Sequence, residues 1–386
     1  MSILSTSRRG TDSYKWDSAP ADDIIPLWVA DMDFVTYPGI TEALQRRVQH
    51  GIFGYTLVPD SYYDAVCRWF AEHHGWQISK DDIIYTSGVV PAISAIIKAL
   101  TLPGDQVIVQ GPVYNCFYSS IRNNGCEMVS NSLIYNKETL RYEIDFDDLD
   151  RKLSHERARL FLLCNPHNPG GRVWTRDELT RVAQLCRKHG VRVVSDEIHC
   201  ELTLHDNRYV PFGSLPDELS FGSITCCSPS KAFNTAGLQI ANIVCRDAAV
   251  RERIDRAINI NEVCDVNPFG VIALQAAYTD GGYEWLCELR RYLTANYEML
   301  LSFFAEHLPH LPVMRMEGTY LAWVDCSALD ETSEEIEERL MRENRVWVNA
   351  GSMYGKEGEH FIRINMACPS ELLKEGLRRI AQGLLQ

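Results

Sequence analysis

The sequence predicts an α/β fold, in which a large domain with a mostly parallel β-sheet is joined to a smaller α+β domain near the C-terminus. Short apolar runs rich in β-branched residues recur at 82–86, 106–110, 159–164, 191–195, 223–228 and 240–245. Helix-like stretches lie between several of these runs. Strands that are apolar on both faces and alternate with helices are typical of a parallel sheet covered on both sides. The pattern changes after Gly281, which indicates a second lobe.

Apolar periodicity identifies the helices between the runs. Residues 91–100 follow the first run, and residues 176–189 follow the third. In residues 176–189 the apolar side chains recur at helical spacing, and charged side chains occupy the other face. The apolar positions are Leu179, Val182, Ala183, Leu185 and Cys186. Sheets of this kind bind their ligands at the carboxyl ends of the strands.

The C-terminal part is predicted to alternate helices and strands without a parallel repeat. We expect a long helix over 283–307, a strand within 316–325, an acidic helix over 333–344, a strand near 361–365 and a final helix. The chain is therefore predicted to have three parts. Residues 1–45 form an irregular segment that packs on the small domain, residues 46–282 form the large domain, and residues 283–386 form the small domain.

Composition limits the class of protein. The chain has 386 residues, of which 46% are hydrophobic and 23% charged, as in ordinary globular proteins with room for two domains. No run of about 18 apolar residues is present, so no membrane span is predicted. The N-terminus lacks the apolar run of a signal peptide, and we expect a cytoplasmic protein. A net charge of −14 without a basic block argues against nucleic acid as a partner.

Several common catalytic centres lack their sequence signals. The 13 cysteines are scattered without a CxxC pair, so we interpret them as small buried hydrophobic residues in a reducing compartment. No HExxH or paired-cysteine spacing occurs, and no metal site is predicted. No GxSxG turn occurs, which argues against a serine hydrolase of the α/β type.

Polar residues follow several of the apolar runs, where the predicted sheet would place its ligand site. They are Ser87, Gly88, Tyr114, Asn168, Asp196 and Lys231. Each has an ordinary structural alternative when taken alone. An aspartate after a strand often caps a helix, and the Asn-Pro pairs around Asn168 mark turns. A single loop lysine is commonly solvated.

Taken together, these residues resemble a known family. SPSK ending at Lys231, the DE pair at 196–197, NPHNP at 165–169 and FIRINMA around Arg363 are similar to fold-type I pyridoxal-phosphate (PLP) enzymes. The resemblance covers nearly the whole chain. It implies an aspartate-aminotransferase-like fold, PLP as the cofactor, and a homodimer with active sites between the subunits.

The resemblance assigns the residues around the cofactor ring. Lys231 would hold PLP as a Schiff base and then act as the general base at the substrate Cα. Asp196 would keep the pyridine nitrogen protonated, and Asn168 would bind the ring hydroxyl oxygen. His199 stands where aminotransferases usually have a tyrosine on the same oxygen; a structural histidine is the alternative. Tyr114 would stack on the ring and could protonate the departing sulfur.

The resemblance also assigns the phosphate and substrate contacts. The phosphate would take backbone amides at a helix start, hydroxyl groups, and a tyrosine from the other subunit. The residues in these positions are Gly88, Val89, Val90, Ser228, Ser230 and Tyr55. Arg363 would bind the substrate carboxylate with a bidentate fork, assisted by the backbone near Ala30 and by Asn168. An ion pair at the edge of the core is the alternative for Arg363.

Departures from the aminotransferase pattern point to elimination chemistry. Most aminotransferases of this fold have an arginine eight residues after the lysine, where this chain has Gln239. LWVADMDF (27–34), DEIH (196–199), SPSKAFNTAGLQ and EGTYLAW (317–323) resemble the MalY/PatB group of carbon–sulfur β-lyases. The implied reaction is α,β-elimination of cystathionine or another S-substituted L-cysteine to a thiol, pyruvate and ammonia. An aminotransferase and a PLP-bound regulatory or binding protein are the alternatives.

Overall fold

A seven-stranded sheet forms the centre of the larger part of the computed structural model, which describes residues 3–260 and 265–385. The strand order is β2-β10-β9-β8-β7-β3-β4. The strands are β2 (Ile83–Thr86), β3 (Gln106–Val109), β4 (Glu127–Ser130), β7 (Ala158–Cys164), β8 (Arg192–Asp196), β9 (Ile224–Cys227) and β10 (Ala241–Val244). Only β10 runs antiparallel to its neighbours. The predicted fold class is therefore confirmed, and all six apolar runs contain strands.

Alternate side chains of the strands enter two different hydrophobic cores, one on each face of the sheet. Leu160 and Leu162 of β7 pack in the core that contains α3 (Val89–Leu100), α4 (Asn115–Asn123) and α8 (Ala248–Asn259). Phe161 and Leu163 face the core that contains α5 (Phe146–Leu153) and α6 (Arg176–His189). Because both faces are covered, β7 and its neighbours are mostly apolar and do not alternate between polar and apolar residues.

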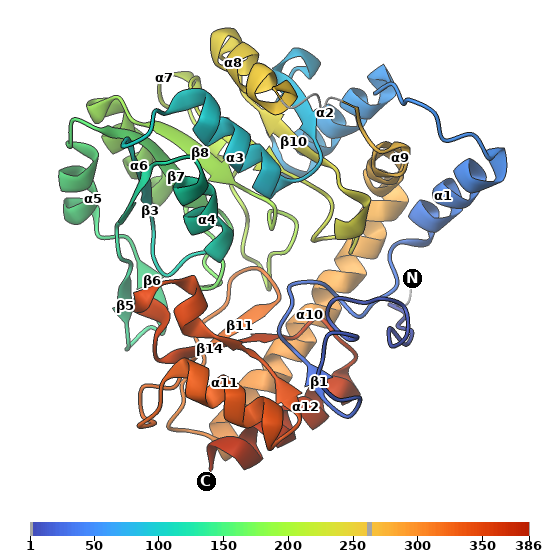
Figure 1. Ribbon diagram of the computed structural model, residues 1–386, viewed down its shortest axis with the longest axis vertical. Coiled ribbons are helices and arrows are strands. Elements are labelled where there is room, and N and C mark those ends of the chain that lie inside the picture. The colour runs from blue at the N-terminus through green and yellow to red at the C-terminus, as the bar shows by residue number, and fades with distance from the viewer. Residues whose placement is uncertain (1–2, 261–264, 386) are drawn as a thin grey trace.

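The C-terminal part contains a separate three-stranded antiparallel sheet at the other end of the molecule (Figure 1). Its strands are β11 (Leu321–Asp325), β14 (Phe361–Asn365) and β13 (Asn349–Ala350). The helices around it are α10 (Asp280–His307), α11 (Ser333–Arg342) and α12 (Ser370–Leu384). The strand expected within 316–325 is β11, which occupies the second half of that range. The three-part division of the chain stays a proposal, since α10 crosses the boundary expected at residue 282.

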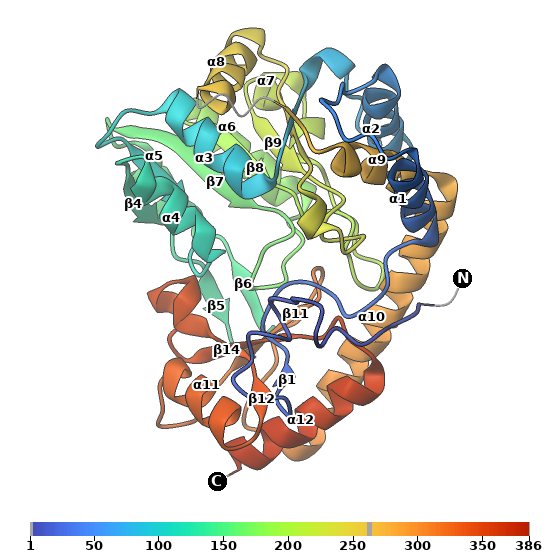
Figure 2. The ribbon, with the colours of Figure 1, turned by 45° about the vertical axis from the view of Figure 1, so that its right-hand side comes forward.

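The first 45 residues were expected to be irregular, which is wrong in two places. Strand β1 (Ile25–Pro26) pairs in parallel with β12 (Val346–Trp347). Helix α1 (Pro38–His50) begins before residue 45, with the proline at a position where its fixed φ and missing N–H cost nothing. Helix α9 (Pro268–Ala277) packs against α1 and against α2 (Asp60–His74). Figure 2 shows the N-terminal segment, which includes β1, passing close to α10 and β12.

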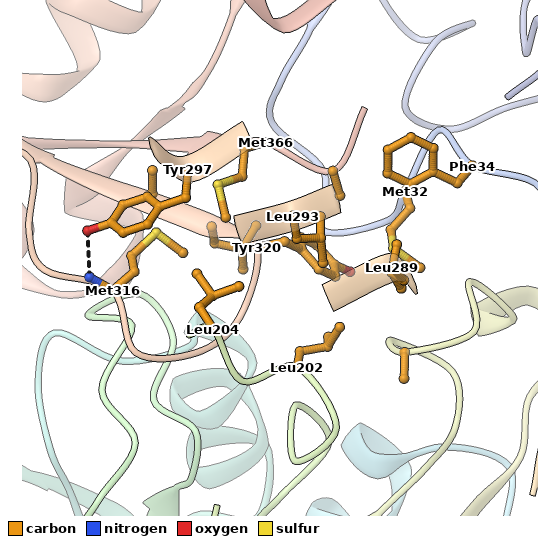
Figure 3. Packing of buried hydrophobic residues seen from close by; sticks show 14 of the residues in the cluster. Met32, Phe34, Leu202, Leu204, Leu289, Leu293, Tyr297, Met316, Tyr320 and Met366 are labelled. Atoms are coloured by element: carbon orange, nitrogen blue, oxygen red, sulfur yellow. Dashed lines mark hydrogen bonds between the residues drawn. The ribbon is translucent and has the colours of Figure 1, made fainter. Parts of the chain in front are cut away.

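One hydrophobic cluster joins the N-terminal segment to both larger parts (Figure 3). Met32 and Phe34 come from the N-terminal segment, Leu202 from the loop after β8, and Leu293 from α10. Tyr320, which immediately precedes β11, is fully buried in the same cluster. The cluster fixes the N-terminal segment between the two sheets. Within the described residues, no helix is long and apolar enough to cross a membrane.

Candidate active site

A cavity of about 520 Å³ lies where the carboxyl ends of the central strands face β14. Most of the site residues predicted from the sequence line this cavity. Ala30, Gly88, Val89, Val90, Tyr114, Asn168, Asp196, His199, Ser230, Lys231 and Arg363 all line it. Ser228 and Tyr55 are not among its lining residues. The cavity is thus formed at the strand ends, as parallel sheets dictate.

The amine of Lys231 points toward the N-terminal segment. Its Nζ donates a hydrogen bond to the Ala30 carbonyl oxygen at 2.7 Å. Desolvation and the positive charge of Arg363 lower the pKa of Lys231 to about 8, although Asp31 and Asp196 act in the opposite direction. A pKa this close to neutrality leaves a useful fraction of the amine uncharged, so it can act as a nucleophile or a base.

We expect Lys231 of the cofactor-free protein to react with acetic anhydride with a midpoint near pH 8. Competitive labelling followed by peptide mass analysis measures this midpoint, with the surface residue Lys188 as internal reference. The Asp196→Asn variant should lower the midpoint further, because it removes a negative charge that raises the pKa of Lys231. A midpoint above pH 10 would show that the amine is solvated.

Asp196 is the last residue of β8 and is buried, with 4% of its surface exposed. Burial raises the pKa of its carboxyl to about 7, although the Ile198 N–H and the charge of Lys231 lower it. The Ile198 N–H donates to Oδ1 at 3.1 Å. A buried carboxyl of this kind is stabilised in its charged form by a cation placed against it. A protonated ring nitrogen is such a cation.

His199 presents a buried polar atom to the cavity. Its Nδ1 has no hydrogen-bond partner among the residues that the structure describes. Burial and the nearby charges of Lys231 and Arg363 hold the pKa of His199 well below its ordinary value, so the ring is neutral. Buried polar atoms are normally paired, and this one is therefore a position for a ligand atom. The alternative of an internally satisfied structural histidine is not supported.

The start of α3 provides one polar end of the cavity. Val89 and Val90 are its first two residues, and Gly88 is the N-cap. The first N–H groups of a helix have no intrahelical partner and lie at the positive end of the helix dipole. Such a terminus suits a phosphate group. Gln239 also lines the cavity, at the position where most aminotransferases of this fold have an arginine.

Ser228 and Ser230 take different positions. Ser230 lines the cavity, whereas the Ser228 hydroxyl donates to the Ile240 carbonyl oxygen at 2.6 Å. The Ser228 oxygen also accepts the backbone N–H of Ser230 at 3.1 Å. These two hydrogen bonds of Ser228 stabilise the loop that contains Lys231. Sequence spacing alone could not distinguish the two serines, because the Ser228 hydroxyl is directed by a carbonyl group twelve residues further along the chain.

Arg363 lies on β14 and is held by neutral acceptors. One of its terminal nitrogens donates to the Trp28 carbonyl oxygen at 2.7 Å and to Asn349 Oδ1 at 3.0 Å; the other donates to Asn168 Oδ1 at 3.2 Å. Its guanidinium carbon is 4.8 Å from the centre of the Tyr354 ring. Within the described chain, no carboxylate forms an ion pair with it. The ion-pair alternative is therefore not supported, and the charge remains for an anionic ligand.

The Arg363→Ala variant is expected to raise KM by roughly 10- to 150-fold, which corresponds to a charge-assisted hydrogen bond worth about 1.5–3 kcal/mol. KM rises because the variant loses Arg363, the only arginine that lines the cavity in the part of the chain that the structure describes. Steady-state kinetics at fixed pH measures the effect. Arg291→Ala, on the exposed face of α10, is the control and should leave KM unchanged. An unchanged KM in Arg363→Ala would mean that another group binds the carboxylate.

The carbonyl groups of residues 28–32 accept hydrogen bonds from side chains that sequence reasoning missed. Tyr320 donates to the Ala30 carbonyl oxygen at 2.9 Å, alongside Lys231. Asn365 donates to the carbonyls of Val29 and Asp31, and Asn234 donates to that of Met32. These partners are about 200 to 340 positions away along the chain. The segments LWVADMDF and EGTYLAW indicated the family resemblance, but they did not indicate which residues form these hydrogen bonds.

Tyr114 and Tyr55 differ in environment. Tyr114 caps α4, lines the cavity, and has its pKa raised by burial and by the nearby Cys116, so its hydroxyl stays protonated. Tyr55 lies between α1 and α2 and is 96% exposed. It does not reach the cavity of its own chain, which agrees with its expected place in the site of another subunit without testing it.

The fold and the cavity together define a class of protein. A mostly parallel sheet whose strand ends present a buried aspartate beside a lysine of lowered pKa, facing an arginine from a second sheet, is the arrangement of fold-type I PLP enzymes. The chain belongs to the aminotransferase class I and II family, whose profile matches residues 22–380.

The chain is similar to known proteins along nearly its full length, and three of them illustrate this. Cystathionine beta-lyase PatB of Bacillus subtilis (strain 168) is 43% identical, with 98% of each chain covered. Protein MalY of Escherichia coli (strain K12) is 32% identical, covering 96% of this chain and 95% of its own. The crystal structure of cystalysin from Treponema denticola, which contains pyridoxal 5'-phosphate, is 32% identical with a TM-score of 0.95 over 99% and 98% of the two chains.

Proposed function

We propose that this chain is a PLP-dependent carbon–sulfur β-lyase, which converts an S-substituted L-cysteine such as cystathionine to a thiol, pyruvate and ammonia. The observation that carries the proposal is one cavity containing an amine with a pKa near 8, a buried carboxyl and an arginine without an ion-pair partner in the described chain. The similarity to cystathionine beta-lyase PatB favours elimination over amino transfer.

The lining residues fit PLP. Asp196 would face the ring nitrogen, Asn168 and His199 the ring hydroxyl oxygen, and Tyr114 a ring face. The start of α3 and the Ser230 hydroxyl would hold the phosphate. The unpartnered Nδ1 of His199 supports this fit, because a buried polar atom requires a partner.

When bound, PLP supplies an electron-accepting ring that makes the Cα proton of an amino acid removable. Arg363 binds the substrate carboxylate and fixes which bond of Cα faces Lys231. The neutral amine of Lys231 takes the Cα proton. The Tyr114 hydroxyl, kept protonated by burial, donates a proton to the departing sulfur. The carbon–sulfur bond breaks, the sulfur leaves as a thiol, and one water molecule completes the formation of pyruvate and ammonia.

The test incubates the enzyme with L-cystathionine or S-methyl-L-cysteine and measures thiol, pyruvate and ammonia, with and without an added 2-oxo acid. Equal amounts of the three products, independent of the oxo acid, are expected for a β-lyase. Turnover that requires the oxo acid would identify an aminotransferase instead. No turnover under either condition, in protein that has bound PLP, would favour the non-catalytic alternative.

We also propose a cytoplasmic homodimer in which Tyr55 completes the site of the partner subunit. Exposed apolar side chains cluster near it along the chain, namely Val48, Ile52, Phe53 and Leu57. Large exposed apolar patches commonly mark subunit interfaces. Every cysteine that the structure describes is free, as expected in a reducing compartment.

Mixing two impaired variants tests the shared site. In a dimer of Tyr55→Ala and Lys231→Ala subunits, one of the two sites has both native residues and the other has neither. Refolding the two variants together is expected to restore about a quarter of wild-type activity from statistical pairing. Activity that stays at the level of the separate variants would place Tyr55 in the site of its own chain or outside any site.

A further inference from the structure

An aromatic cluster stands at the edge of the cavity. The Trp28 ring stacks on Trp347 with 4.0 Å between ring centres and 14° between planes. On Trp28, Tyr14 packs at 5.2 Å with a tilt of 52°. Tyr14 and Trp28 both line the cavity, and Tyr14 is 71% exposed. We call Tyr14, Trp28 and Trp347 the aromatic shelf. The three rings have no role in the chemistry described above.

The shelf is fixed relative to the carboxylate-binding arginine. The Trp28 carbonyl oxygen accepts the 2.7 Å hydrogen bond from Arg363, and its indole N–H donates to the Lys15 carbonyl oxygen at 3.2 Å. The same residue therefore orients Arg363 and supplies the central ring of the shelf. A substrate whose carboxylate binds Arg363 must have the rest of its body in the cavity that Trp28 borders. The cavity lining also includes the apolar side chains Val29 and Met353.

The charged side chains of the cavity already have roles in the proposed reaction. Asp196, Lys231 and Arg363 are its only ionisable acidic and basic lining residues in the part of the chain described, apart from the neutral His199. The sulfur substituent of cystathionine carries an ammonium and a carboxylate. Neither would meet an opposite charge on the described lining, and desolvating an unpaired charge is costly. An uncharged aromatic substituent would instead find ring faces and apolar side chains.

We propose that the aromatic shelf selects cysteine thioethers whose sulfur substituent carries an aromatic ring and no charge. The inference rests on the proposed function, because it names the substrate class of that same site. Ring stacking contributes about 0.5–1.5 kcal/mol beyond area burial, which corresponds to about a 2- to 10-fold preference from each contact.

The experiment compares kcat/KM of the PLP-loaded enzyme for S-benzyl-L-cysteine, S-methyl-L-cysteine and L-cystathionine. The released thiols differ in acidity, and this difference is the same for every variant. The change in the benzyl-to-methyl ratio between wild type and variant therefore isolates the contribution of the shelf. The wild type should prefer the benzyl substrate to both others. In Tyr14→Ala and Trp28→Leu, the benzyl-to-methyl ratio of kcat/KM should fall by about 2- to 10-fold. Tyr14→Ala is the safer variant for folding, because that side chain is largely exposed.

Phe221→Ala is the matched control, since Phe221 is an exposed aromatic residue remote from this cavity; its ratio should equal that of the wild type. Preference for cystathionine, or a benzyl-to-methyl ratio unchanged in both shelf variants, overturns the inference while turnover itself upholds the lyase. Absence of thiol release from all three substrates overturns the proposed function instead. Restoration of the ratio in Trp28→Phe would support stacking as the cause.

Discussion

Replacement of Lys231 by alanine is expected to lower kcat for thiol release by about 10²- to 10⁴-fold, the usual contribution of a positioned general base. No other lysine is found among the described residues that line the cavity. Its desolvated amine, with a pKa near 8, is therefore the base closest to the operating pH. Steady-state kinetics at saturating substrate measures the loss.

Two further observations separate a chemical role of Lys231 from a structural one. Lys188→Ala changes a surface lysine that pairs with Asp150 on the protein exterior, and should behave as the wild type. Borohydride reduction of the PLP-loaded wild type should attach the cofactor to the peptide that contains Lys231. Attachment to a different lysine, or near-normal kcat in Lys231→Ala, would remove the residue from its proposed role.

Replacement of Asp196 by asparagine is expected to weaken PLP binding by about 3–5 kcal/mol, the cost of leaving a buried charge without its partner. The amide keeps the size of the side chain but cannot supply the negative charge for a ring nitrogen. Equilibrium dialysis, followed by the absorbance of bound cofactor, measures the affinity. Asp217→Asn, at an exposed position in α7 (Asp217–Ser220), is the control.

The same variant should not destabilise the cofactor-free protein at pH 8. Burial raises the pKa of Asp196 from 3.8 to about 7, so the folded state binds its proton more tightly than the unfolded chain. The stability from this group is present below pH 3.8 and is lost as the pH rises through 7. At pH 8 the asparagine variant should unfold at the same or a higher temperature than the wild type. A clearly lower unfolding temperature would assign Asp196 a structural role.

The sequence determined the elements whose signals are local. Residues 176–189 form a helix with the predicted bounds, because Thr175 and Glu178 complete a capping box and the apolar positions repeat at helical spacing. Six strands of the central sheet are predictable because they are mostly apolar and buried, whereas the partly exposed edge strand β4 has no such signal. Asn168, Asp196 and Lys231 are close to strand ends, and the parallel sheet alone brings such positions to one edge.

Only the tertiary structure decided how distant segments share hydrogen bonds. Arg363 is oriented by Trp28 and Asn349, and the Ala30 carbonyl is shared by Lys231 and Tyr320. No periodicity or motif spacing encodes these contacts, since they join residues that meet only after both sheets have packed. The sequence thus set which side chains are present at the strand ends, because secondary structure follows local patterns. The packing of the N-terminal segment between the two sheets determined where these side chains point and which groups they bond. A buried polar group must bond to whatever partner the fold places beside it.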